Sequence, residues 1–195
     1  MKSISRMKNM LIDITLKITP QMLKNARQKQ NTALDGHLGT HFDVMNKDFP
    51  LAYTHRNGII FNVSNITGRD ICSGDIDLSK VEKDMFVAFY TGFIEDVGYG
   101  NKGYFSEHPQ LSDELIDTLL EKGISIIGVD FAGIRRSAEH TPKDQYCADH
   151  GAFVIENLCN LQSLISHSGN FIAHTYPMNF EGLTGLPCRV IAEIE

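Results

Sequence analysis

Two histidines and an aspartate stand close together in this chain: His37, His41 and Asp43, with Gly39 between the two imidazoles. Neutral imidazole and carboxylate together are ligands that suit zinc, manganese or iron(II). The alternative is a solvated turn that is simply polar. The added carboxylate and the intervening glycine favour the metal site, so the stretch predicts a bound divalent ion.

The spacing tests which backbone shape could bring these side chains together. On a helix, Asp43 would lie roughly 240° around from His37 and point away from it. On a strand, His41 and Asp43 share a face because side chains alternate. His37 would then lie about 13 Å from His41 in a fully extended chain, unless Gly39 permits a bulge or a sharp bend. We therefore predict a bent loop that enters a strand.

The rest of the chain must supply the elements that hold this stretch. Runs rich in apolar, β-branched or aromatic residues predict strands over residues 10–16, 59–63, 85–91, 124–129, 171–177 and 188–194. Asn57-Gly58 predicts a tight turn before the second of these runs. Residues 149–160 are expected to form a helix or turn that leads into a further strand. Strands that alternate with few helices indicate a mixed α and β class.

Residues 21–30 are expected to form a short basic helix or a mobile loop. A second helix is expected over residues 113–122, with a single helical turn at 163–166. Ser112 is a good N-cap for the second helix, and Gly123 ends it. Residues 135–146 are charged and are expected to be irregular. Residues 94–108 hold several glycines and aromatic residues, which indicates a shaped loop that overhangs a pocket.

Composition narrows the class of protein. A length of 195 residues predicts one domain over 1–195, and 42% hydrophobic residues are enough for a sizeable core. A formal charge of −6 and no basic run argue against a nucleic-acid partner. No stretch is apolar enough for a membrane span. Four scattered cysteines indicate reduced thiols and a cytoplasmic location: Cys72, Cys147, Cys159 and Cys188.

Glu156 lies inside an apolar frame, Ile-Glu-Asn-Leu. A carboxylate there costs free energy unless it is paired or bound to a metal. A glutamate that points out of the frame into solvent is the other possibility, and the sequence alone leaves both open.

The stretch from His37 to Asp43, HLGTHFD, resembles the metal signature of the cyclase-like, kynurenine-formamidase-like hydrolase family. Further stretches resemble the family in the same order, from about Leu11 to the C-terminus: FYTG at 89–92, HPQLS at 108–112, IENLCNL at 155–161 and PCRVIA at 187–192. The resemblance implies an α/β fold with a mixed, barrel-like central sheet flanked by helices. It also implies a divalent metal, usually zinc or manganese, a homodimer or homotetramer, and hydrolysis of amide bonds in small molecules.

Two positions depart from the family pattern. After the aspartate, the family usually has a proline and then a histidine two residues later, where this chain has Met45 and Lys47. The family also has a histidine twelve residues before the glutamate that matches Glu156, where this chain has Asp144. His140 and His150 are near that position but out of register.

The expected site follows from both lines of reasoning. His37, His41 and Asp43 would hold the metal, and Asp144 with Glu156 would bind a second ion or accept a proton from water. Lys47 would shuttle a proton or neutralise an oxyanion, or would simply be a loop lysine.

The favoured function is a metal-dependent, arylformamidase-like hydrolase that cleaves an amide, or cyclic amide or ester, of a small molecule. The alternatives are a diverged, non-catalytic family member that binds metal and a small molecule, and a metal-dependent dehydratase or isomerase.

Overall fold

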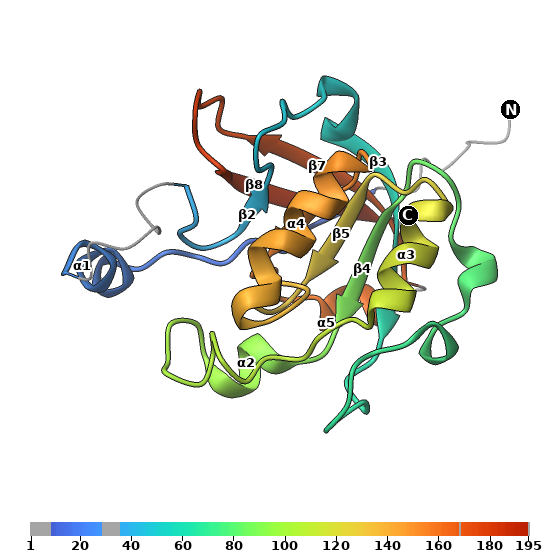
Figure 1. The fold of residues 1–195 in the computed structure, drawn as a ribbon, viewed down its shortest axis with the longest axis horizontal. Coiled ribbons are helices and arrows are strands. Elements are labelled where there is room, and N and C mark those ends of the chain that lie inside the picture. Colours follow the sequence, from blue (N-terminus) through green and yellow to red (C-terminus); the bar gives the residue numbers. More distant parts are fainter. Residues whose placement is uncertain (1–8, 29–35, 168, 195) are drawn as a thin grey trace, which may run out of the picture.

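Seven strands close into a barrel in the computed structural model, which describes residues 9–28, 36–167 and 169–194 (Figure 1). Around the barrel the order is β8-β2-β6-β5-β4-β3-β7, and pairing of β7 with β8 completes the ring. Strands β3 to β6 run parallel to one another, and the remaining pairs are antiparallel. The closed mixed sheet confirms the expected α/β fold. The seven strands are β2 (His41–Asp43), β3 (His55–Asn62), β4 (Phe86–Tyr90), β5 (Ile126–Val129), β6 (Phe153–Glu156), β7 (Asn170–Pro177) and β8 (Gly185–Ile194).

The described residues also form an eighth strand and five helices outside the ring of seven strands. Strand β1 (Met10–Asp13) pairs with residues 191–194 of β8, beyond the part of β8 that pairs with β2. Helices α3 and α4 lie on the same side of β4 and β5, and α1 stands apart from the barrel (Figure 1). The helices are α1 (Pro20–Gln28), α2 (Phe93–Val97), α3 (Asp113–Glu121), α4 (His140–Asp149) and α5 (Gln162–Ile165). Single 3-10 turns occur at Leu51–Thr54, Ser73–Asp75, Leu78–Lys80 and Ser137–Glu139.

Side-chain alternation divides the core into two layers. On β4, Phe86 and Ala88 join a cluster to which every barrel strand contributes, whereas Val87 and Phe89 join a second cluster. The second cluster includes the buried face of α3 and Cys147 of α4. The barrel therefore has an apolar interior, and its outer face over β3 to β6 is covered by helices.

Most of the predicted elements are present within one to four residues of their expected bounds. The N-cap prediction is confirmed, because Ser112 Oγ accepts a hydrogen bond from the Leu115 N–H at 3.1 Å. Gly123 follows the helix in the left-handed region at φ 70°. Helix α1 accounts for the helix expected over 21–30, of which positions 29 and 30 lie outside the described residues.

Two expectations were wrong. Asn57 and Gly58 lie inside β3, paired with Ile172 and Phe171 of β7, and not in a turn. The glycine makes room for a ring, since a Cβ on Gly58 would lie 2.5 Å from Phe171. Residues expected to be irregular include helix α4, which buries Asp144, Cys147 and Ala148.

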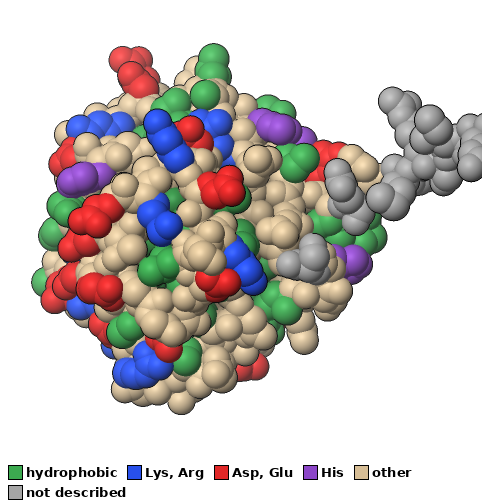
Figure 2. Space-filling view, turned by 90° about the vertical axis from the view of Figure 1, so that its right-hand side faces the viewer, with side chains coloured by type: hydrophobic (Ala, Val, Ile, Leu, Met, Phe, Trp, Pro, Cys, Tyr) green, Lys and Arg blue, Asp and Glu red, His purple; other side chains and the backbone are tan. Residues whose placement is uncertain are grey.

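The surface carries charges of both signs. Figure 2 shows one face on which acidic and basic side chains are interspersed, with hydrophobic side chains in small separate groups. Among the helices of the described residues, none has the length and apolar character needed to cross a membrane.

Candidate metal centre

Strand β2 places two predicted ligands on one face of the barrel wall. The Phe42 side chain is fully buried in the barrel interior, so His41 and Asp43 project from the opposite, outer face. Strand β2 lies between β6 and β8, and His41 pairs with Glu156 in the antiparallel β2–β6 ladder. Directly opposed residues in such a ladder have neighbouring side chains. Glu156 therefore points toward His41 and not into solvent.

A bent loop brings His37 to the same face. Gly39 has φ 75°, which allows the turn before β2. Gly36 packs against Gly185 of β8, where a Cβ on Gly36 would lie only 1.9 Å from the Gly185 carbonyl oxygen. As a result, the Nε2 atoms of His37 and His41 lie 3.3 Å and 3.5 Å from Asp43 Oδ1. We call His37, His41 and Asp43 the first ligand group.

Helix α4 adds two more side chains. His140 and Asp144 are four residues apart and share a face of the helix. His140 Nε2 lies 2.9 Å from Glu156 Oε1 and 3.1 Å from Asp144 Oδ2. In the second ligand group, the donor atoms of four residues lie within 4.8 Å of one another: Asp43, His140, Asp144 and Glu156. Asp43 belongs to both groups, so the two groups are contiguous.

Sequence reasoning missed His140. It lies four residues before Asp144, the position at which the family pattern has its histidine. Only the turn of helix α4 brings the His140 side chain beside Asp144. A His-x-x-x-Asp spacing is the signal that could have found it, since i and i+4 side chains meet only on a helix.

The donor atoms fit a divalent cation. Asp43, Asp144 and Glu156 are only 2–3% exposed, and burying carboxylates costs free energy unless cations neutralise them. Within the described part of the chain, neither Asp43 Oδ2 nor Asp144 Oδ1 has a hydrogen-bond partner. Buried carboxylate oxygens without hydrogen-bond partners, beside imidazole nitrogens, are suited to coordinate a divalent metal.

A backbone carbonyl group fixes the orientation of the His41 ring. Its Nδ1 lies 2.8 Å from the Gly39 carbonyl oxygen. With Nδ1 as the donor, Nε2 keeps its lone pair toward Asp43 and Glu156, the arrangement typical of a metal-bound histidine. The same carbonyl accepts a hydrogen bond from Asn157 Nδ2 at 2.9 Å. Asn157 and the glycine loop therefore help to orient a ligand, although the sequence singled out neither for this role.

The pKa values of these groups depend strongly on one another. Burial lowers the pKa of His41, but the charges of Asp43 and Glu156 outweigh burial and raise it to about 9. Burial also lowers the pKa of His140, and its hydrogen bonds to Asp144 and Glu156 raise it to about 11. Burial and the charge of Asp43 raise the pKa of Asp144 to about 8. Protons thus neutralise the cluster, and a metal ion that binds there would displace protons.

Both ligand groups line one pocket of about 410 Å³, which we call the metal pocket. His37 and His140 are its more exposed ligands, with side chains 24% and 34% exposed. Tyr99 and Phe105, from the loop expected to overhang a pocket, also line it.

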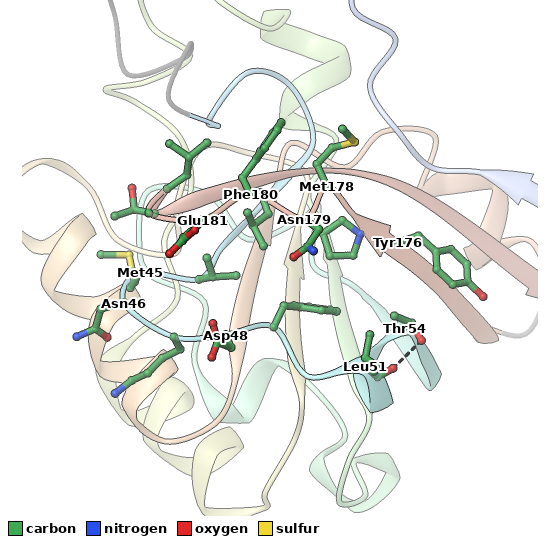
Figure 3. A pocket seen from close by; sticks show the side chains of 18 residues that line it. Met45, Asn46, Asp48, Leu51, Thr54, Tyr176, Met178, Asn179, Phe180 and Glu181 are labelled. Carbon is green, nitrogen blue, oxygen red and sulfur yellow. Dashed lines mark hydrogen bonds between the residues drawn. The ribbon is translucent and has the colours of Figure 1, made fainter.

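A second hollow, whose lining side chains Figure 3 shows, adjoins the metal pocket. This adjacent groove of about 760 Å³ shares Met45 and Thr184 with the metal pocket. Tyr176, Met178 and Phe180 are exposed large side chains along it. Neither ligand group lines this groove. Although its volume is larger, the metal pocket is therefore the candidate active site.

Lys47 is not brought into the metal pocket. It lines the adjacent groove, and its Nζ lies 2.7 Å from Asp149 Oδ1. Of the sequence-predicted site residues, five therefore meet at the pocket, namely His37, His41, Asp43, Asp144 and Glu156. A catalytic role for Lys47 stays a prediction.

Comparisons with known proteins agree with this geometry. Residues 12–135 match a family model described as "Putative cyclase". No curated protein was found to match the chain.

Solved structures share the fold. One, described as a potential metal-dependent hydrolase with cyclase activity, is 22% identical with a TM-score of 0.77, over 96% of this chain and 99% of that one. A predicted metal-dependent hydrolase from Bacillus stearothermophilus is 23% identical, with a TM-score of 0.75 and the same coverage. Isatin hydrolase A from Ralstonia solanacearum is 15% identical, with a TM-score of 0.71 over 96% of this chain and 92% of that one.

Proposed function

Because the chain belongs to the cyclase family, we propose that it is a metal-dependent hydrolase that cleaves an amide, or a cyclic amide or ester, of a small molecule. The observation that carries this proposal is the shared position of Asp43, which joins two ligand groups in one pocket. The metal pocket, at about 410 Å³, suits a small molecule and not a polymer. Similarity of fold to an isatin hydrolase supports a cyclic amide as one substrate class.

His37, His41 and Asp43 would hold a zinc or manganese ion, and the second ligand group offers sites for another. When bound, such an ion polarises a carbonyl group and lowers the pKa of water from about 15.7 toward 7. In the net reaction, water adds hydroxyl to the acyl carbon and hydrogen to the leaving nitrogen or oxygen. The protein must therefore accept one proton and deliver one.

Glu156 and His140 are suited to that proton transfer. Burial and the charge of Asp43 raise the pKa of Glu156, which moves its carboxylate toward the basicity that a general base needs near neutral pH. Its Oε1 atom lies 2.9 Å from His140 Nε2, and the raised pKa of His140 keeps that imidazole protonated, so it is placed to deliver a proton. Asp144 Oδ2 lies 3.1 Å from the same Nε2 atom, so the two carboxylates together hold that edge of the imidazole.

The decisive experiment measures metal content and turnover together. Purified protein should hold about one or two ions per chain, and metal-loaded protein should hydrolyse members of a panel of aryl formamides, lactams such as isatin, and lactones. His41→Ala should lose both the metal and the activity. His150→Ala is the matched control, because its exposed imidazole lies outside both ligand groups. A wild-type protein that stays folded but neither retains nor rebinds metal would refute the proposal.

A second function has a specific observation in its favour. Met45, Lys47 and Asp144 replace residues that the resemblance associates with the site, which is compatible with a family member that binds metal and a small molecule without turnover. Stoichiometric metal without hydrolysis of any panel member would favour this alternative.

A further inference from the structure

Tyr99 is a residue of the metal pocket that belongs to neither ligand group. It stands between Gly98 and Gly100, which have φ values of 81° and 84° in the left-handed region. Its ring packs against Tyr104 and Phe105, with ring centroids 5.4 Å and 5.9 Å away. The two glycines and the neighbouring rings fix how this side chain enters the pocket.

The hydroxyl group of Tyr99 is tied to the metal-binding loop. Its oxygen accepts a hydrogen bond from the Gly39 N–H at 3.0 Å. The carbonyl of the same residue, Gly39, contacts His41 Nδ1 at 2.8 Å. A single residue therefore holds both the Tyr99 oxygen and a ligand imidazole. This link sets the position of the hydroxyl relative to the ligands.

The proton of that hydroxyl is available to a ligand in the pocket. A tyrosine hydroxyl donates one hydrogen bond and also accepts, and Tyr99 uses its acceptor capacity for Gly39. Over residues 9–28, 36–167 and 169–194, no group accepts the Tyr99 proton. The imidazoles of the pocket are assigned to metal binding by the proposed function, and its remaining side-chain donors belong to Thr141, Asn157 and Thr184.

We propose that the Tyr99 hydroxyl donates a hydrogen bond to the acyl oxygen of the substrate, the atom on which negative charge develops during hydrolysis. This inference rests on the proposed function. The acyl oxygen carries more negative charge in the transition state than in the ground state, so a hydrogen bond to it is stronger in the transition state. A donor that is already oriented provides this stabilisation without a cost of reorientation. Tyr99 then acts on the substrate, whereas the ligand groups act on the ion.

Tyr99→Phe removes the hydroxyl oxygen and keeps the ring that packs on Tyr104 and Phe105. The matched control is Tyr176→Phe, the same atomic change at a side chain that is 65% exposed in the adjacent groove. Both variants and wild type are loaded with zinc and titrated with acetohydroxamate, a probe that presents an acyl oxygen and needs no turnover. Metal content and thermal unfolding are measured on the same samples.

We expect Tyr99→Phe to keep its metal and to bind acetohydroxamate about 10- to 100-fold more weakly, the effect of losing a hydrogen bond to a charged group. Tyr176→Phe should bind within about twofold of wild type. On any substrate that wild type cleaves, kcat should fall by a similar factor while KM changes little.

Three outcomes would overturn the proposal: unchanged acetohydroxamate binding in Tyr99→Phe, loss of metal from that variant, or failure of wild type to bind the probe. Loss of metal would mean that Tyr99 acts only through Gly39 on the ligand loop. Wild-type protein that binds the probe but cleaves nothing would refute the proposed function alone, and the ratio of the two dissociation constants would still decide the role of Tyr99.

Discussion

His41 and Glu156 face each other across the β2–β6 pair, with His41 Nε2 and Glu156 Oε2 separated by 3.7 Å. They are 115 positions apart in sequence, yet ladder register alone makes them neighbours. On the same outer face, helix α4 closes over Glu156 and contributes His140. The candidate site thus depends on two independent contacts, a strand register and a helix docked on the barrel wall, and each can be tested separately.

The second ligand group should depend on His140. In His140→Ala the first ligand group, with His37, His41 and Asp43, remains complete, so we expect the variant to retain about one tightly bound ion per chain. Any second ion should bind at least about tenfold more weakly, the usual lower range for loss of a metal-site partner. Elemental analysis after dialysis against graded chelator concentrations measures this, with His150→Ala as the control. Complete loss of metal from His140→Ala would show that the two groups act as one site.

The close contact between Gly36 and Gly185 should be essential for the loop that carries His37. Gly36→Ala would place a methyl group 1.9 Å from a backbone oxygen, so the loop must move. Gly182→Ala is a matched control, since Gly182 also has positive φ, at 78°, but has nothing within 4 Å of an added Cβ. Left-handed strain alone costs about 1 kcal/mol, and the Gly36 variant should lose about 2–3 kcal/mol or more.

Urea unfolding of both glycine variants, together with their metal content, checks this expectation. Gly36→Ala should also bind metal more weakly than Gly182→Ala, because His37 is displaced. Equal stability and equal metal content in the two variants would mean that the Gly36 contact does not hold the ligand loop.

Much of the first ligand group could be predicted from local sequence. The period-two alternation of His41, Phe42 and Asp43 correctly indicated a strand with two polar side chains on one face. Gly39 correctly indicated the bend that returns His37 to that face. These inferences succeeded because strand alternation and the freedom of glycine are properties of a few consecutive residues.

The second ligand group could not be predicted in the same way. The buried stripe of α4 consists of Asp144, Cys147 and Ala148, which gives almost no apolar periodicity. Its carboxylate is buried where α4 packs on the barrel wall, with His140 beside it and Asp43 and Glu156 opposite, which is a tertiary effect. The role of Gly58 could not be predicted from local sequence either, because it depends on contact with the Phe171 ring on another strand. Pairing of β3 with β7 likewise decides the architecture through contacts between residues that lie far apart in the sequence.

Stability should fall with rising pH because of Asp130, a buried carboxyl at the end of β5. Burial raises its pKa to about 7, although Thr91 and Gly92 donate hydrogen bonds to it. In the unfolded chain its pKa is near 3.8. The folded state therefore binds the proton more tightly, so this group contributes stability that is fully present below about pH 4 and is lost as pH rises through about 7.

Asp130→Asn isolates this contribution, because an amide oxygen can still accept from Thr91 and Gly92. Urea unfolding of chelator-treated protein from pH 4 to pH 8 should show wild type losing stability relative to Asp130→Asn, by at most about 1.4 kcal/mol per pH unit. A constant difference across this range would mean that the three hydrogen bonds to Asp130 keep it ionised in the folded protein.

Lys47 offers the sharpest contrast between sequence and structure. Its ammonium group forms an ion pair with Asp149 at 2.7 Å, and the two side chains are 39% and 49% exposed. An ion pair this exposed adds little to stability because solvent screens it, and it keeps the charge in the adjacent groove and away from both ligand groups. On a substrate that wild type hydrolyses, Lys47→Ala should therefore keep its metal and change kcat/KM by less than about threefold. A fall of tenfold or more in kcat with full metal content would instead mean that Lys47 leaves Asp149 and enters the metal pocket when substrate binds, as its position after Asp43 first suggested.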